Sequence, residues 1–136
     1  MSAASIQGLP RTTQPTCQQT GDNQSGADIP PYRIVKRVLA GLPGQIALAT
    51  TNADFYCGTT TETIYNGRSA SYQDAGLGVV ETGGVFAVGD RLTADGSGRA
   101  IKSTVLTQSL LGRAYTASSG AGDFASYEAR REGNIA

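Results

Sequence analysis

Residues 83–102 hold three short apolar segments separated by two turn signals, and this stretch limits the fold more than any other. Gly89 and Asp90 separate the first two segments, and the Asp-Gly-Ser-Gly run at residues 95–98 turns the chain back into the third. Asp-Gly supplies the positive φ that a tight hairpin needs, so we expect that conformation at Gly96. Since no segment is long enough for a typical helix, the stretch predicts a β meander.

Similar short patterns recur along the chain from residue 34 onward. In the last of them Ala125, Tyr127 and Ala129 alternate with polar residues, which is typical of a strand with one solvated face. Turn signals recur at the spacing of a sandwich or barrel, and 18 glycines in 136 residues supply them. The sequence therefore predicts an all-β chain, a small β-barrel or sandwich-like domain. The predicted strands are residues 34–40, 44–50, 55–59, 68–72, 76–81, 85–88, 92–94, 99–102, 110–115 and 124–130, and a short helical turn is an option before residue 110.

Residues 1–28 are rich in Gln, Thr, Ser and Gly, and Ile6 and Leu9 are their sizeable aliphatic residues. A segment with so little apolar surface does not fold alone. Two interpretations stay open: a disordered tail, or an arm that becomes ordered against a partner. The predicted organisation is an extended polar N-terminal arm at 1–28, a β-barrel-like domain at 29–132 and a flexible C-terminus at 133–136.

The composition argues against most catalytic and metal sites. The chain has no histidine, which is the commonest general base and metal ligand. Cys17 and Cys57 are too few for a four-ligand zinc site, and we expect two free thiols in a reducing compartment. The formal charge of +0 predicts no nucleic-acid or anionic-membrane partner, and no apolar run reaches transmembrane length. We expect no enzyme, no cofactor and no metal.

Two other function classes stay open. Tyr32, Tyr56, Tyr65 and Tyr72 are candidates for a surface that stacks sugars, which is the alternative of a carbohydrate- or host-surface-binding module. The absence of Trp weakens it. A hydrolase with a Ser-Lys dyad is weaker still, because both lysines of the chain lie on predicted strands with alternating charge.

The order and spacing of short motifs from residue 34 to 130 resemble the capsid cement, or head-decoration, proteins of tailed bacteriophages. Cys57-Gly58-Thr59 stands where that family usually has a Gly-Val step. The polar arm lies outside the resemblance. The other matching residues are Lys36-Arg37, Ala40-Gly41, Gly76, Val80, Gly83-Gly84-Val85, Gly89-Asp90-Arg91-Leu92-Thr93-Ala94-Asp95, Gly98-Arg99-Ala100, Leu111-Gly112-Arg113-Ala114 and Ala121-Gly122-Asp123.

The resemblance implies a structural protein, made in the host cytoplasm and located on the outer capsid surface of the virion. It would clamp neighbouring subunits of the major capsid protein, commonly as a homotrimer, and the sugar-binding alternative would be displayed on the same particle. The candidate contacts with the capsid or a sister subunit are the apolar residues of the arm and its boundary: Ile6, Leu9, Ile29, Pro30, Pro31 and Tyr32.

Overall fold

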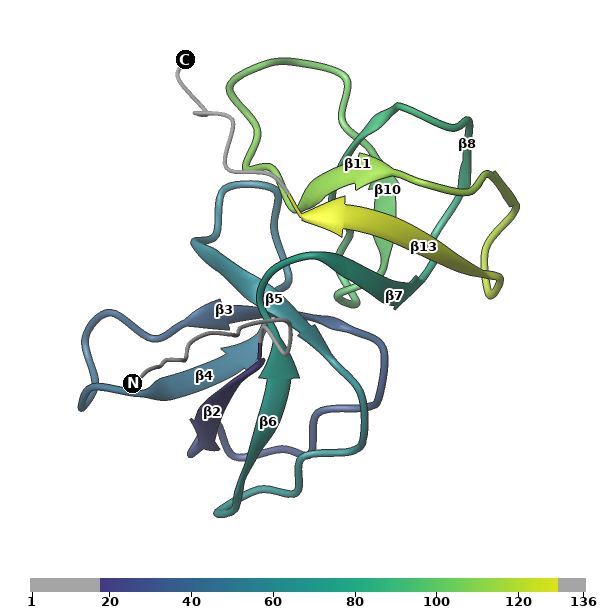
Figure 1. The fold of residues 1–136 in the computed structure, drawn as a ribbon. Helices are drawn as coiled ribbons and strands as arrows, with labels where there is room; N and C mark the ends of the chain where they lie inside the picture. Colours follow the sequence, from purple (N-terminus) through teal and green to yellow (C-terminus); the bar gives the residue numbers. More distant parts are fainter. Residues whose placement is uncertain (1–17, 130–136) are drawn as a thin grey trace, which may run out of the picture.

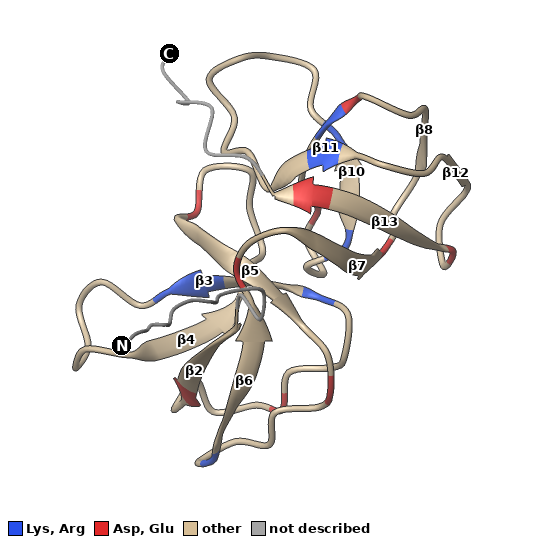
Figure 2. Ribbon diagram, in the orientation of Figure 1, with Lys and Arg blue, Asp and Glu red and all other residues tan. Residues whose placement is uncertain are grey.

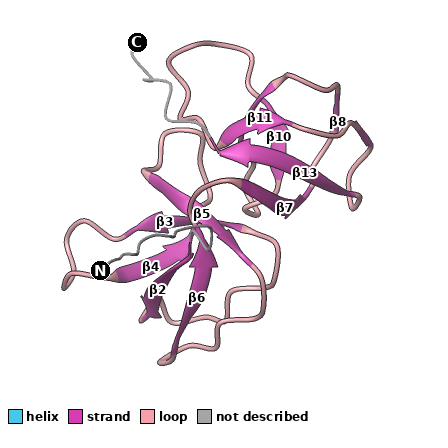
Figure 3. Ribbon diagram, in the orientation of Figure 1, coloured by secondary structure: helices cyan, strands magenta, loops and turns pink. Residues whose placement is uncertain are grey.

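The computed structural model describes residues 18–129, and this part of the chain consists of β-strands and loops (Figures 1 and 3). The all-β class expected from the sequence is confirmed. Among the described residues there is no helix that could cross a membrane. The strands are β2 (Gln18–Asn23), β3 (Ile34–Arg37), β4 (Gln45–Leu48), β5 (Tyr56–Thr60), β6 (Ser69–Gln73), β7 (Leu77–Glu81), β8 (Val85–Phe86), β9 (Arg91–Ala94), β10 (Ala100–Lys102), β11 (Gly112–Ala114), β12 (Ser118–Ser119) and β13 (Phe124–Ala129).

The first half, residues 18–73, is called lobe 1 and forms a closed barrel with the strand order β2-β4-β3-β5-β6. β2 and β4 pair in parallel, and the other neighbours pair antiparallel. Every strand contributes alternate residues to the interior, so short strands suffice to enclose a core. That core consists of Ile29, Val35, Ile46, Ile64 and Tyr72.

Strand β2 lies inside the segment that the sequence analysis assigned to the polar arm, so the expected boundary at residue 28 does not hold. Its inward positions supply room and hydrogen bonds rather than apolar area. A Cβ at Gly21 would overlap Ile46, and buried Asn23 donates from Nδ2 to the Ile64 and Ala27 carbonyls at 2.9 Å each. A strand built in this way carries no hydrophobic alternation.

The second half, residues 77–129, is called lobe 2 and contains a five-stranded sheet in the order β10-β9-β11-β13-β7, with β8 and β12 as a separate pair. An isolated parallel bridge between Thr82 and Ala100 joins the two edges of the sheet. Gly83 N–H donates to the Ala100 carbonyl there at 2.8 Å. The curled sheet encloses a core that includes Val80, Leu92, Ala100, Ala114, Ala125 and Tyr127.

The two lobes have the same topology. In each lobe, the first strand (β2 or β7) pairs antiparallel with the last strand (β6 or β13). The C-terminal end of the first strand also pairs in parallel with the third strand (β4 or β10). The third strand pairs with the second, the second with the fourth and the fourth with the last, all antiparallel. The Ile29–Ile64 bridge of lobe 1 occupies the place of the β8–β12 pair in lobe 2. The chain is therefore an internal tandem repeat, in which β2, β3, β4, β5 and β6 correspond to β7, β9, β10, β11 and β13.

Backbone hydrogen bonds outside the ladders support the same correspondence. Gly67 N–H donates to the Asn23 carbonyl at 2.7 Å, and the corresponding Gly122 N–H donates to Thr82 at 2.8 Å. Four further pairs of bonds match with the same polarity. In each pair the lobe 1 bond is given first, and each bond runs from the N–H of the first residue to the carbonyl of the second. The pairs are Asn23 to Arg68 with Thr82 to Asp123; Tyr32 to Thr60 with Gly89 to Ala114; Thr60 to Arg33 with Ala114 to Asp90; and Ala49 to Ile34 with Ser103 to Arg91.

The two lobes contact each other at an interface that we call the seam. One side of the lobe 1 barrel packs there against one end of the lobe 2 barrel. The Tyr56 hydroxyl reaches into the end of lobe 2, 2.9 Å from both Thr93 Oγ1 and Ala94 N, and Thr59 Oγ1 lies 2.7 Å from the Tyr127 hydroxyl. Ile34 N–H donates to the Gly98 carbonyl at 2.8 Å. The core of lobe 2 thus includes Ile34, Ala49 and Tyr56 from lobe 1.

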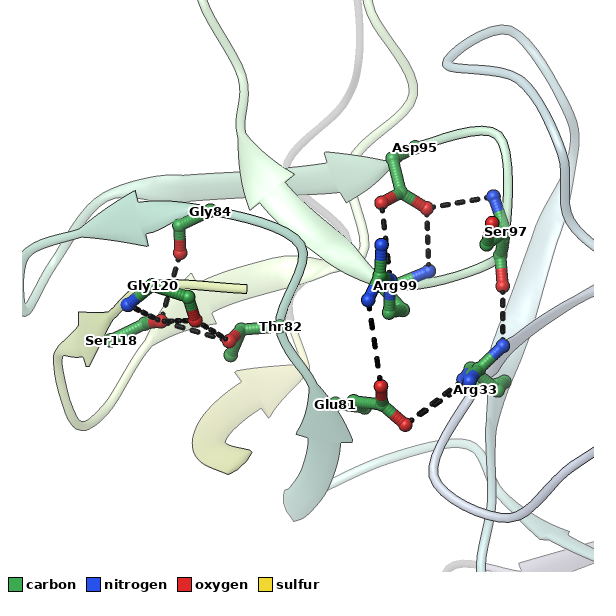
Figure 4. A network of polar contacts seen from close by, with 9 residues as sticks. All are labelled: Arg33, Glu81, Thr82, Gly84, Asp95, Ser97, Arg99, Ser118 and Gly120. Carbon is green, nitrogen blue, oxygen red and sulfur yellow. Dashed lines mark hydrogen bonds and ion pairs between the residues drawn. The ribbon is translucent and has the colours of Figure 1, made fainter. Parts of the chain in front are cut away.

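Charged groups close one edge of the seam. Arg33 and Arg99 both approach the carboxylate of Glu81, at 3.2 and 3.7 Å (Figure 4). Arg33 Nη1 also donates to the Ser97 carbonyl at 2.9 Å, and Ser97 lies in the β9–β10 turn. This cluster ties the turn of lobe 2 to lobe 1.

The β9–β10 hairpin forms as predicted, but its positive φ lies at Gly98 (φ 75°) rather than at Gly96. Asp95 organises the turn by accepting hydrogen bonds at Oδ1 from Ser97 N–H (2.8 Å) and Arg99 N–H (2.9 Å). The left-handed residue is therefore the next-to-last residue of the loop, which spans residues 95–99. The expectation at Gly96 was wrong because the carboxylate of Asp95 lengthens the turn.

Candidate interaction surface

The outer face of strands β7 and β13 carries exposed apolar side chains. Val79 pairs with Ser126, and Leu77 pairs with Glu128. Because paired residues point to the same face of a sheet, these side chains lie together on the outside, while Val80, Ala125 and Tyr127 point into the core. The alternation expected for residues 124–130 is confirmed as far as Ala129, where the described part ends.

We call the apolar part of this face the lobe 2 patch. Its members are 41–57% exposed: Leu77, Val79, Tyr115 and Phe124. Tyr115 N–H donates to the Ser126 carbonyl at 2.8 Å, which places Tyr115 on the other side of Ser126 from Val79. The small Ser126 side chain thus lies between larger apolar side chains. Contiguous exposed apolar residues of this kind mark interaction surfaces.

The tandem repeat shows that the fold does not require these apolar residues. The positions of lobe 1 that correspond to Leu77, Val79, Tyr115 and Phe124 are Gln18, Thr20, Thr61 and Ser69. All four are polar and exposed. Since the same sheet geometry forms with polar residues in lobe 1, the stability of the barrel does not explain the apolar ones in lobe 2.

Charged groups border the patch on one side, and an aromatic ring borders it on the other. Glu128 pairs with Arg113 across the sheet, and Arg113 pairs with Arg91. On the other side, the ring of Tyr32 meets Phe124 edge-to-face with centroids 5.5 Å apart. The charged side fits the usual arrangement of a protein-binding surface, in which an apolar centre has a polar rim.

The residues predicted to contact the capsid or a sister subunit differ in their exposure in the structure. Ile6 and Leu9 lie outside the described residues. Ile29 is 1% exposed and belongs to the core of lobe 1, so it offers no contact surface, because its bridge to Ile64 turns it inward. Pro30, Pro31 and Tyr32 are half-buried, and Tyr32 adjoins the patch through Phe124.

The proposed tyrosine surface does not form, because two of its members are buried. Tyr56 and Tyr72 are 8% and 7% exposed, whereas Tyr65 is exposed. Burial raises the pKa of Tyr72 to about 12, with the nearby Cys57 thiol adding to the effect. Burial also raises the pKa of Tyr127 to about 12, against the opposing hydrogen bond from Thr59. These phenols act as protonated hydrogen-bonding groups of the core.

Charged side chains are distributed over both lobes, and neither sign dominates one of them (Figure 2). Lys36 lies 3.6 Å from Asp54, and Lys102 lies 3.9 Å from Asp90. Burial raises the pKa of Asp54, but hydrogen bonds from Thr50 and Thr51 and the charge of Lys36 outweigh it and leave the pKa lowered. Across residues 18–129 no three His, Cys, Asp or Glu side chains are placed to hold a metal ion. Cys57 is a thiol, and Cys17 lies outside the described residues.

No protein-family model matches the chain, and no curated protein matches it either. A solved structure shares its fold: the N base of head fiber gp8.5 of bacteriophage phi29, with a TM-score of 0.66. The superposition covers 84% of this chain and 93% of that chain at 19% sequence identity. At this identity the comparison establishes the fold that the two chains share.

Proposed function

We propose that this chain is a structural virion protein of a tailed bacteriophage, which binds the outer surface of the capsid and carries out no catalytic step. The observation that carries the proposal is the fold shared with a phage head fiber base over most of both chains. The order of motifs that resembles capsid cement proteins supports it independently.

In this proposal the chain contacts the major capsid protein and associates with itself as a homotrimer. A protein that binds only the assembled shell stabilises that shell by mass action, in proportion to its binding free energy. Many identical copies multiply a modest contact. Neighbouring capsid subunits would then be clamped together without any chemical step.

The lobe 2 patch is the surface that we assign to the shell. Leu77, Val79 and Phe124 are exposed although the fold does not need them, and burying them against a partner would release apolar surface from water. The polar equivalents in lobe 1 provide a design for removing the patch while keeping the fold.

The test is binding to capsids that lack this chain. The variant Leu77→Gln, Val79→Thr, Phe124→Ser gives lobe 2 the residues of lobe 1, and Val85→Thr is the control, because Val85 is 70% exposed outside the patch. We expect at least tenfold weaker co-sedimentation for the triple variant and no change for the control. The melting temperature of the control should be unchanged, and that of the triple variant should fall only slightly, because it loses the ring contact between Tyr32 and Phe124.

Two different failures are distinguishable in that experiment. A wild-type chain that does not bind capsids would overturn the proposed function. A triple variant that binds as well as the wild type would leave the function and overturn the assignment of the patch. Cryo-electron microscopy of decorated particles would then locate the contact directly.

The burial of Tyr56 and Tyr72 removes the aromatic cluster on which the carbohydrate-binding alternative depended. Tyr65 and Tyr115 stay exposed, but they lie in different lobes. We therefore propose the capsid-binding function alone.

A further inference from the structure

The seam between the lobes joins two different surfaces of one repeated unit. Lobe 1 contributes one side, including Asn52, Tyr56 and Thr59, and lobe 2 contributes one end, including Ala94, Ser109 and Tyr127. A contact between unlike surfaces of like units leaves one copy of each surface unused. Within residues 18–129, the end of lobe 1 and the side of lobe 2 have no counterpart.

The correspondence between the lobes identifies these two unused surfaces. The loops 49–58 and 103–112 have equal length and begin and end at corresponding residues, so Asn52 corresponds to Leu106 and Ser109 corresponds to Phe55. The open end of lobe 1 therefore includes Phe55, and the open side of lobe 2 includes Leu106. The end of lobe 2 that matches the open end is filled by the Tyr56 side chain of lobe 1.

The residue pair at the centre of the unused surfaces is apolar, although its equivalent in the seam is polar. Within the chain, Ser109 N–H donates to the Asn52 carbonyl at 2.7 Å. At the unused surfaces the same two places hold Phe55, which is 55% exposed, and Leu106, which is 68% exposed. Val105 beside Leu106 and Leu39 near Phe55 are also exposed.

The open end of lobe 1 is hollow enough to receive a side chain. A depression of about 270 Å³ lies there, lined by residues that include Arg37, Phe55, Tyr72 and Asp74. It joins a groove of about 970 Å³ that continues past Leu39 to Leu110. Leu110 corresponds to Tyr56, the residue that fills the matching end of lobe 2.

We propose that the chain associates with itself head to tail, with the open side of lobe 2 of one copy docked in the open end of lobe 1 of the next. The occupant follows from continuity with the seam, because the same two kinds of surface already bind each other inside the chain. The ion pair of the seam is not repeated, since Arg33 and Glu81 correspond to Asp90 and Asp22. The contact between copies therefore rests on its apolar side, around Phe55 and Leu106.

This inference deepens the self-association part of the proposed function and is tested in solution without capsids, so the two can fail separately. Phe55→Asp blocks the open end, Leu106→Asp blocks the open side, and Val85→Asp is the matched control on another surface. Circular dichroism and melting temperature verify that each variant is folded. Analytical ultracentrifugation and light scattering then give the mass of each protein alone and of mixtures.

We expect the wild type and Val85→Asp to form a closed oligomer of finite mass, and each blocked variant to associate at least 100-fold more weakly. An equimolar mixture of the two blocked variants should form a heterodimer, because each retains the surface that the other lacks. Only contact between unlike surfaces gives this complementation.

Three results would overturn the proposal: a monomeric wild type, oligomers that persist in both variants, or a mixture that stays monomeric. A wild type that becomes oligomeric only after removal of residues 1–17 would assign the open end to that segment instead. A variant without residues 1–17 is therefore measured as well, because Gln19, which closely follows that segment, also lines the depression.

Discussion

Lobe 1 and lobe 2 have one topology and matching backbone hydrogen bonds, but their outer faces have opposite character. Where lobe 2 exposes Leu77, Val79 and Phe124, lobe 1 exposes Gln18, Thr20 and Ser69. The comparison separates what the barrel needs from what it tolerates. Backbone pairing and inward residues define the unit, and its outer face is available for other purposes.

Inside the two lobes, corresponding positions accept the same types of residue. Gly58 and Gly112 correspond, and a Cβ at either would overlap a backbone carbonyl, that of Gln73 or of Glu128. Buried Tyr72 and Tyr127 correspond as well. Tyr32 has a φ of 59° where lobe 2 has Gly89 with a φ of 89°, so lobe 1 accepts a strained conformation there that glycine avoids.

The largest expected difference comes from truncation. Deleting residues 1–28 removes strand β2 and opens the barrel of lobe 1, whereas deleting 1–17 keeps every described strand. We expect the longer deletion to abolish cooperative folding of lobe 1 and the shorter one to retain it, as measured by hydrogen exchange of residues 34–73. Full protection after the longer deletion would show that β2 is dispensable.

The next largest expected effect on stability comes from substituting the two corresponding glycines, Gly58 and Gly112. Gly58→Ala and Gly112→Ala each force a methyl group against backbone atoms of the neighbouring strand, and we expect each to lower the free energy of unfolding by about 3 kcal/mol. Chemical denaturation measures both. Gly84→Ala is the control, because only the tip of Ile101 would contact its Cβ, at 3.8 Å. Unequal losses would show that the strand contact is tighter in one lobe.

The two buried tyrosines should respond differently to loss of the hydroxyl. Tyr127→Phe leaves buried Thr59 Oγ1 without its 2.7 Å partner, which we expect to cost about 2 kcal/mol of unfolding free energy. Tyr72→Phe should cost less, about 1 kcal/mol, because Tyr72 lines the hollow end of lobe 1 and is less completely buried than Tyr127. Equal losses in urea denaturation would contradict the role of the seam bond.

Burial of Tyr127 should also make the stability of the protein depend on pH in the alkaline range. The pKa of Tyr127 is about 12 in the folded chain and near 10 when unfolded. Its contribution is therefore fully present below pH 10 and is lost as the pH rises towards 12, by up to about 1.4 kcal/mol per pH unit. Tyr127→Phe should show a shallower decline of stability between these values. An identical slope would mean that Tyr127 ionises freely in the fold.

The smallest difference is expected at two corresponding turns. Gly98 has a φ of 75° and its Cβ would overlap Leu48 across the seam, whereas Gly44 has a φ of 89° with open space around it. We expect Gly44→Ala to cost about 1 kcal/mol through backbone strain, and Gly98→Ala somewhat more. Gly96→Ala should change the melting temperature little, because Gly96 has neither constraint.

Most strands could be located from the sequence, because turn signals separate runs with clear alternation. All ten predicted strands exist, and their described ends lie within three residues of the predicted ones. β2 could not be recognised, because Gly21 and Asn23 fill its inward positions. Before residue 110, where a short helical turn was possible, a single turn forms in which Gln108 N–H donates to the Val105 carbonyl at 3.3 Å, and it does not extend into a helix. Ser109 N–H instead bonds the Asn52 carbonyl across the seam.

The patch was harder to predict than the fold. Residues 76–81 were recognised as a strand, but Leu77 and Val79 have the composition of core residues, and only their place outside the sheet shows that they are exposed. The repeat itself has a weak signal in the sequence, since Ala70-Ser71-Tyr72 and Ala125-Ser126-Tyr127 are its longest identical run among corresponding strands. Contacts across strands, rather than local pattern, define the candidate surface.

The seam also dictates an order of events during protein synthesis. Lobe 1 closes its core with residues that all precede position 74, so its barrel can form while the rest of the chain is still being translated. The core of lobe 2, by contrast, includes Ile34, Ala49 and Tyr56, which only a finished lobe 1 presents in the right place. We therefore expect the first repeat to fold first and to complete the core of the second.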